Sequence, residues 1–146
     1  ELSTIIEEKK AVIQSEGLPD LKVIPFQIEQ LFINLLSNSL KYTRPGVPPV
    51  ISISSQTVAA KDVPGIKADP QKLFARITFT DNGLGFEQQF AENIFVLFKR
   101  LHQKNEYPGT GIGLSICRKI ADNHSGFISA TGKPGEGASF SLFLPV

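Results

Sequence analysis

The sequence contains little of what marks several common classes of protein. Its 146 residues include one cysteine and no methionine or tryptophan. One cysteine can neither close an internal disulfide nor build a cysteine-based zinc site, so we expect a reducing compartment. No apolar run approaches the roughly 20 residues that a membrane-spanning helix needs, and no signal peptide is visible at Glu1. We therefore expect a cytoplasmic location and no membrane contact by this part of the protein, whether or not the parent protein is anchored.

An excess of charge of either sign is also absent. Fifteen Lys and Arg residues oppose fourteen Asp and Glu residues, which leaves a net charge of +1. A balance this even does not favour a nucleic-acid partner. With 41% apolar and 20% charged residues, the composition is typical of a globular domain and excludes a disordered tail. The length suits one hydrophobic core.

Apolar periodicity and turn signals predict an α/β (α+β) two-layer sandwich, in which a mixed β-sheet carries helices on one face. Residues 1–9 are expected to be the tail of a helix from a preceding dimerisation region, and residues 10–146 to form one domain. Helical segments are predicted at Pro25 to Tyr42, Ile112 to Asn123 and, in part, Phe86 to Phe98. Strands are predicted at 11–15, 21–24, 50–54, 73–80, 127–131 and 138–144. Ser55 to Lys72 is predicted to be a long surface loop.

The strongest predicted helix, Pro25 to Tyr42, has two contrasting faces. Its core-facing stripe consists of Ile28, Leu31, Phe32, Leu35, Leu36, Ser39 and Leu40. The opposite side carries Gln30, Asn34, Asn38 and Lys41. Asparagine costs a helix interior about half a kcal/mol relative to alanine, yet a pair lies one turn apart here. The row is either a solvated face or the lining of a polar cleft, where amide oxygens suit Mg²⁺ and the lysine suits phosphate.

A glycine motif, Asp81-Asn82-Gly83-Leu84-Gly85, follows the strand predicted at 73–80. Asn-Gly is typical of a hairpin turn. No paired strand follows, however, and a hairpin would not need the second glycine. The motif therefore favours a backbone that a flat ligand approaches closely, with Asp81 offering a carboxylate to an exocyclic amine.

A second glycine motif, Gly109-Thr110-Gly111-Ile112-Gly113-Leu114, runs directly into a predicted helix. Free N–H groups and the positive end of the helix dipole make such a loop a ready anion site. The motif is neither a dinucleotide fingerprint, because no strand precedes it, nor a P-loop. A third pair of glycines, in Gly135-Glu136-Gly137, is predicted to form a tight hairpin turn.

Three of these motifs, in this order, resemble the N, G1 and G2 boxes of the GHKL ATPases. They are Asn34-Leu35-Leu36-Ser37-Asn38-Ser39-Leu40-Lys41-Tyr42, Asp81-Asn82-Gly83-Leu84-Gly85 and Gly109-Thr110-Gly111-Ile112-Gly113-Leu114. Ile94 to Leu101 is similar to the F box of sensor histidine kinases. The resemblance covers nearly the whole chain and identifies residues 10–146 as similar to the catalytic ATP-binding domain of a two-component sensor histidine kinase.

The resemblance implies a site for ATP and Mg²⁺. Asn38 would coordinate Mg²⁺ with Asn34 beside it, and Lys41 and Tyr42 would border the phosphates and the nucleotide. Asp81 would accept a hydrogen bond from the adenine amino group. The residues implied to let the base approach the backbone are Gly83 and Gly85.

The resemblance also implies a lid over the phosphates, from Phe86 to Pro108. Phe95 and Phe98 would anchor this lid, and Arg100 would reach the γ-phosphate. Further nucleotide-binding residues implied in the lid and in the loop after it are Lys99, Gly109, Thr110, Gly111, Gly113 and Leu114. The residues implied to be catalytic are Asn34, Asn38, Lys41 and Arg100.

Asn34 stands where hydrolytic relatives and anti-sigma serine kinases carry a glutamate, and an amide cannot act as a base. We therefore expect slow ATP hydrolysis and direct transfer of the γ-phosphoryl group to a histidine, which is the activity of a protein histidine kinase. The alternatives are a degenerate nucleotide-binding regulatory module and a hydrolytic GHKL ATPase or serine kinase.

The chain lacks the acceptor sequence of that family. Its histidines are His102, expected to be a solvated lid residue, and His124, expected to have a structural role at a helix end. The phosphoacceptor and dimerisation helices are therefore expected before Glu1, in a homodimeric parent protein, with a response regulator downstream. Cys117 is expected in the core rather than as a reactive thiol.

Overall fold

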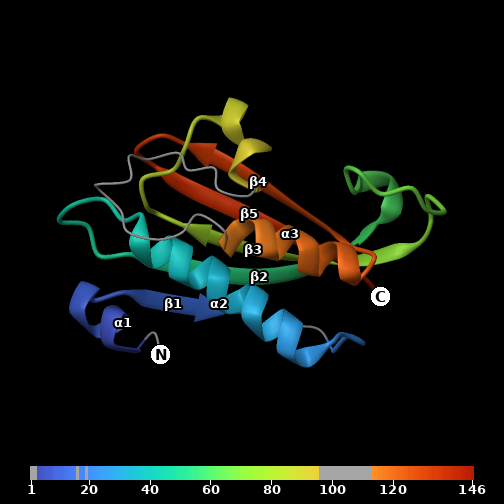
Figure 1. The fold of residues 1–146 in the computed structure, drawn as a ribbon, viewed down its shortest axis with the longest axis horizontal. Coiled ribbons are helices and arrows are strands. Elements are labelled where there is room, and N and C mark those ends of the chain that lie inside the picture. The colour runs from blue at the N-terminus through green and yellow to red at the C-terminus, as the bar shows by residue number, and fades with distance from the viewer. Residues whose placement is uncertain (1–2, 16, 19, 96–112) are drawn as a thin grey trace.

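A computed structural model describes residues 3–15, 17–18, 20–95 and 113–146. Its helices are α1 (Ser3–Lys9), α2 (Pro25–Lys41) and α3 (Gly113–Asn123), with short 3₁₀ turns η1 (Ala60–Asp62), η2 (Gln88–Phe90) and η3 (Asn93–Phe95). Its strands are β1 (Val12–Ser15), β2 (Val50–Ala59), β3 (Leu73–Asp81), β4 (Phe127–Lys133) and β5 (Gly137–Pro145). Figure 1 shows α2 and α3 side by side on one face of the sheet.

The five strands lie in the order β1-β2-β3-β5-β4. β1 runs parallel to β2, and the other neighbours are antiparallel. The sheet is therefore mixed and carries helices on one face, so the predicted fold class is confirmed.

Helix α2 forms where its sequence predicts. Pro25 occupies the first turn, where its missing N–H costs nothing and its fixed φ suits the helix. Leu31, Leu35 and Leu40 are each at most 1% exposed, which confirms the predicted core-facing stripe. The opposite face carries the exposed Lys41.

The two faces of the sheet differ because side chains alternate along each strand. On the helix-covered face, Ile53, Phe79 and Phe140 align across three strands and are all buried. The Phe32 ring of α2 meets the Phe79 ring edge-on, with centroids 4.9 Å apart. The opposite face carries hydroxyl side chains at the neighbouring positions, as at Ser54.

Two predictions at the sheet were wrong. Residues 21–24 form no strand, because Leu21 and Val23 pack on the core while the Ile24 N–H bonds to the ring of His124 instead of to a strand. The loop predicted from Ser55 to Lys72 is shorter, because β2 continues to Ala59 and pairs there with Leu73. The polar residues at the end of β2 are typical of a loop, yet they form regular antiparallel pairs with β3.

The remaining segments differ less from expectation. β4 and β5 each extend beyond the predicted ranges, and the turn at Gly135 joins them as expected, with a φ of 75°. Within Phe86 to Phe95 the structure has the two short turns η2 and η3 in place of an α-helix. No helix in the described part of the chain is long and apolar enough to span a membrane.

Candidate functional site

Asp81, the last residue of β3, lies where several segments of the chain converge. Its Oδ1 accepts hydrogen bonds from the N–H of Gly83 at 2.9 Å and of Ala138 at 3.2 Å. Its Oδ2 accepts one from the hydroxyl of Ser39 at 2.7 Å. A carboxylate offers about four acceptor positions, so these three fix its orientation and leave room for about one more donor. The residue stays partly exposed.

The loop after Asp81 is no hairpin turn, because the neighbours of β3 are β2 and β5. A side chain at Gly83 would clash with the carbonyl oxygen of Tyr42. Gly85 has a φ of +67°, and a side chain there would clash with the carbonyl oxygen of Lys133. Packing within the protein thus accounts for both glycines. Their predicted part in admitting a base to the backbone stays a prediction.

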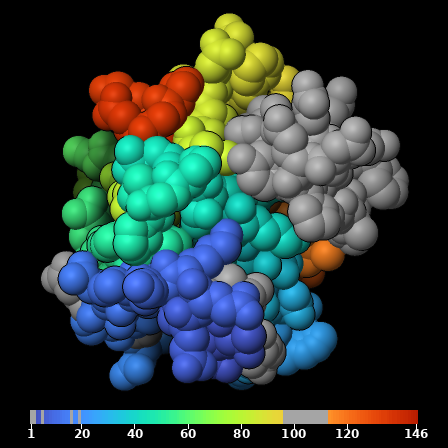
Figure 2. Space-filling view, turned by 90° about the vertical axis from the view of Figure 1, so that its left-hand side faces the viewer, coloured from blue at the N-terminus to red at the C-terminus, as the bar shows by residue number. Residues whose placement is uncertain are grey.

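Backbone hydrogen bonds hold this loop from two sides. The Leu84 N–H donates to the carbonyl oxygen of Tyr42 at 2.8 Å, and the Leu84 carbonyl oxygen accepts from the Gly135 N–H at 2.8 Å. The residue after α2 and the turn between β4 and β5 therefore both bond to the backbone of Leu84. Figure 2 shows the loop after α2 (teal), the segment after β3 (yellow-green) and that turn (red-orange) on one face of the molecule.

Three further hydrogen bonds hold this loop, and local sequence patterns do not predict them. The Arg44 guanidinium donates from Nε to the carbonyl oxygen of Asn82 at 2.8 Å. The Asn82 side chain accepts from the Val50 N–H at 2.8 Å and donates to the carbonyl oxygen of Pro48 at 3.2 Å. The sequence motifs assign no role to Arg44 and place Asn82 only within the first glycine motif. Ser39 was missed as well, although a hydroxyl within an otherwise apolar stripe was a usable signal.

Asn34 joins α2 to the beginning of α3. Its side-chain amide donates to the carbonyl oxygen of Gly113 at 3.3 Å and accepts from the Gln30 side chain at 2.8 Å. The first and last of the three sequence motifs therefore touch, although 79 positions separate these residues. Leu114, next in α3, packs against the core. Because both ends of the Asn34 amide bond within the protein, its predicted role beside a metal stays a prediction.

Asn38 and Lys41 lie further along the same polar face of α2. Asn38 is partly exposed, and within the described ranges its side chain makes no hydrogen bond. The same ranges contain no group of three His, Cys, Asp or Glu residues able to hold a metal ion. A divalent cation here would therefore take one amide oxygen from the chain and its other ligands from phosphates and water, which is how Mg²⁺ usually binds. The residues present fit that requirement.

Arg118 of α3 secures the segment that leads away from the site. Its guanidinium forms an ion pair with Glu92 at 3.0 Å and lies over the Phe95 ring, 4.3 Å from the centroid. Phe95 is buried and meets the Phe140 ring edge-on. The predicted anchor Phe95 thus packs in the core. Other predicted residues lie outside the described ones: Phe98, Lys99, Arg100, His102, Gly109, Thr110 and Gly111.

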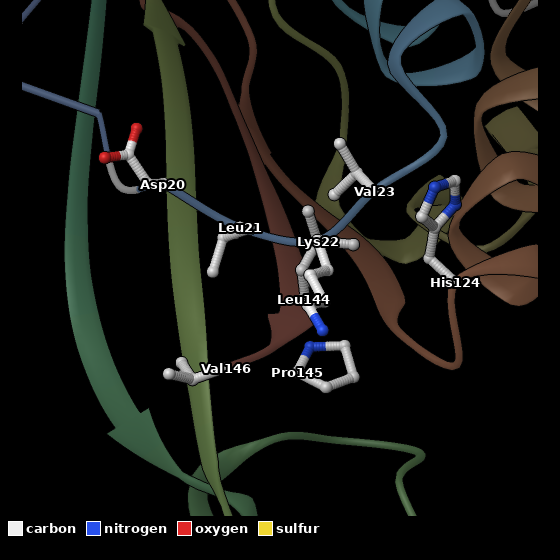
Figure 3. A pocket seen from close by; sticks show the side chains of 8 residues that line it. All are labelled: Asp20, Leu21, Lys22, Val23, His124, Leu144, Pro145 and Val146. Carbon is white, nitrogen blue, oxygen red and sulfur yellow. The ribbon is translucent and has the colours of Figure 1, made fainter.

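His124 has the structural role predicted for it. Its Nε2 accepts from the Ile24 N–H at 2.9 Å. In the tautomer that this bond requires, its Nδ1–H donates to the carbonyl oxygen of Ile120 at 2.8 Å. The ring therefore joins the end of α3 to the start of α2. It borders an open hollow of about 520 Å³ with Leu144, at the end of the sheet away from Asp81 (Figure 3).

Cys117 lies on the side of α3 that faces α2 and is fully buried, as predicted. Its Sγ–H donates to the carbonyl oxygen of Leu31 at 3.8 Å. Burial raises the pKa of the thiol from 9.0 to about 12. A neutral, enclosed thiol is a poor nucleophile, so this cysteine is part of the core.

Comparisons with known proteins show which family and fold this chain resembles. A profile of the family described as histidine kinase-, DNA gyrase B- and HSP90-like ATPases matches residues 24–146. The phytochrome-like protein Cph1 of Synechocystis sp. is 36% identical over 141 residues, which is 97% of this chain and 17% of Cph1. The adaptive-response sensory kinase SasA of Synechococcus sp. is 35% identical over 149 residues, which is 100% of this chain and 36% of SasA. The chain thus spans well under half of either relative.

Solved structures of a histidine kinase share the fold. The catalytic domain of histidine kinase ThkA has a TM-score of 0.71 and 25% identity, covering 99% of this chain and 84% of that chain. ThkA in complex with the response regulator protein TrrA has a TM-score of 0.66 and 26% identity, covering 99% of this chain and 36% of that chain.

Proposed function

The chain belongs to the family of histidine kinase-, DNA gyrase B- and HSP90-like ATPases, as a catalytic ATP-binding domain of the histidine kinase type, and we propose that it binds ATP with Mg²⁺ and donates the γ-phosphoryl group to a histidine of a separate domain. One observation carries this proposal. A carboxylate held in place by three hydrogen bonds lies at the same end of the sheet as the polar face of α2 and the start of α3.

Asp81 would recognise the base. Its carboxylate is oriented by Ser39, Gly83 and Ala138 before any ligand arrives, so little ordering is needed on binding. The acceptor position left on this carboxylate suits one hydrogen of an exocyclic amine, as adenine carries. A guanine would present a carbonyl oxygen at that place, which the carboxylate would repel.

The polar face of α2 would hold the triphosphate. Asn38 offers an amide oxygen to the metal ion, and the ammonium of Lys41 lies one turn of helix further on. When bound, Mg²⁺ supplies neutralisation of the charge on the phosphates. The backbone N–H groups at the start of α3, beside Asn34, add the positive end of a helix dipole.

Asn34 favours direct transfer over hydrolysis. An amide accepts no proton at neutral pH, and this one is already bonded to Gly113 and Gln30. A water nucleophile needs a base, whereas a neutral imidazole nitrogen carries a lone pair ready to attack. We therefore propose a histidine as acceptor.

Binding of ATP with Mg²⁺ to the chain tests the proposal directly, by titration calorimetry. We expect Asp81→Asn to weaken binding by about 1–3 kcal/mol, since an amide placed there leaves the ligand amine or its own donor unpaired. A matched control is Asp69→Asn, in the exposed loop between β2 and β3. Equal affinity of the Asp81 variant and the original chain would contradict the assigned role of the carboxylate, and no binding by the original chain would refute the function.

The partners of the whole protein are also part of this proposal. Because the chain spans only part of its relatives, a separate phosphoacceptor domain in a cytoplasmic homodimer, followed by a response regulator, would complete the reaction. The complex of the similar kinase ThkA with TrrA supports a response regulator as the partner. Mixing the chain and labelled ATP with the histidine-bearing domain of its parent protein, and measuring label on that domain, tests the transfer.

A further inference from the structure

Lys9, the last residue of α1, contacts the end of α2. The Lys9 ammonium donates to the carbonyl oxygen of Leu40 at 2.6 Å and to the hydroxyl of Thr43 at 3.1 Å. Leu40 belongs to the last turn of α2, and Thr43 follows the end of that helix. Figure 1 shows α1 below the end of α2 from which the chain leads toward β2.

This contact has a clear physical basis. The last four carbonyl groups of a helix lack partners within the helix, and they form the negative end of its dipole. A lysine ammonium can both bond to such a carbonyl and stabilise that end electrostatically. Lys9 is partly buried here, which shields the contact from water.

The residues next to this contact hold the Asp81 loop. Tyr42 lies between Leu40 and Thr43 in the chain, and its carbonyl oxygen accepts from the Leu84 N–H. The same carbonyl packs so closely on Gly83 that no side chain fits there. A shift of the end of α2 would therefore move the loop that orients the Asp81 carboxylate.

We propose that Lys9 is a positioning residue for nucleotide binding, which couples the place of α1 to the Asp81 loop through the end of α2. This inference rests on the proposed function, since it names what sets the geometry of the same site. Coupling of this kind is reciprocal, so nucleotide bound at Asp81 must in turn stabilise the docked position of α1.

The first test measures ATP–Mg²⁺ affinity of the 146-residue chain by calorimetry, at a temperature where every variant is folded by circular dichroism. Lys9→Met should weaken binding by about fivefold, the lower end of usual coupling between sites. Lys9→Arg should recover part of the loss, since it keeps a cation able to reach the carbonyl. Lys10→Met is the matched control, because it removes the same charge one residue later from an exposed position.

The second test needs no variant. The Ala11 N–H donates to the carbonyl oxygen of Ile6 at 2.9 Å, so its exchange rate reports whether the end of α1 is intact. Adding ATP with Mg²⁺ should slow hydrogen exchange at Ala11 as well as at Gly83 and Leu84.

The outcomes separate the two proposals. If the original chain binds ATP but Lys9→Met binds equally well, or if ATP protects Leu84 without protecting Ala11, the role of Lys9 is refuted and the proposed function stands. If the original chain does not bind ATP, both fail. If Lys10→Met loses as much ATP affinity as Lys9→Met, the effect comes from the charge alone and not from the contact with Leu40, which also refutes the coupling.

Discussion

Raising the pH above 9 should destabilise the folded chain through one buried thiol. Cys117 is 0% exposed, and burial raises its pKa from 9.0 to about 12. In the unfolded chain the thiol ionises near its ordinary pKa, whereas in the folded chain it keeps its proton until the pH is much higher. Its contribution to stability is therefore fully present below pH 9 and is lost as the pH rises from 9 toward 12.

The magnitude follows from the size of this shift. Each pH unit between the two pKa values of Cys117 removes about 1.4 kcal/mol of unfolding free energy. Between pH 8 and pH 10 the thiol should therefore cost the folded state about 1.4 kcal/mol, because only the upper half of that interval lies above the unfolded pKa.

Urea unfolding of the original chain and of Cys117→Ala at pH 8, 9 and 10 measures this cost. Lysine and tyrosine side chains also titrate in this range, so the informative quantity is the difference in unfolding free energy between the two proteins at each pH. The alanine variant loses packing by the same amount at every pH. A difference that stays constant from pH 8 to pH 10 would refute the reasoning. Rapid alkylation of the native thiol by iodoacetamide would refute its burial.

Three further predictions concern other contacts. His124→Ala should lower the unfolding free energy by about 1–2 kcal/mol in urea titrations, because it removes the bonds to Ile24 and Ile120 while water can replace part of them. An unchanged urea midpoint would show that these two bonds do not stabilise the folded chain. Gly83→Ala should weaken ATP binding strongly, since its methyl group would displace the carbonyl of Tyr42. Gly17→Ala is the control and should leave the affinity unchanged, because no atom lies within 4 Å of the added methyl group. Phosphate release from ATP by the chain alone should stay far below the usual enzymatic turnover of about 10 per second, and several turnovers per second would contradict the absence of a base.

Local patterns in the sequence predicted most of the elements. The stripe of α2 repeats every three to four residues, so its buried and polar faces could be assigned without any distant contact. The predicted places of Cys117, within one helix, and of His124, just after its end, followed in the same way, and both are confirmed. Resemblance of the glycine motifs to a known family predicted the site as a whole.

Contacts between distant segments could not be predicted in this way. The hydroxyl of Ser39 stands out within the apolar stripe, but only the placing of β3 beside α2 brings Asp81 to it. The polar end of β2 became a strand because Leu73 and its neighbours pair with it, which no window of residues within β2 records.

Local patterns were enough to place α2 and α3 and to assign the face that α2 buries, because these features depend on neighbours within a few positions. The tertiary structure alone decided that Asn34 meets Gly113, that Lys9 meets Leu40, and that backbone packing demands a glycine at position 83. Each of these depends on chain segments dozens of residues apart, whose approach is set by the packing of the common core rather than by local preference.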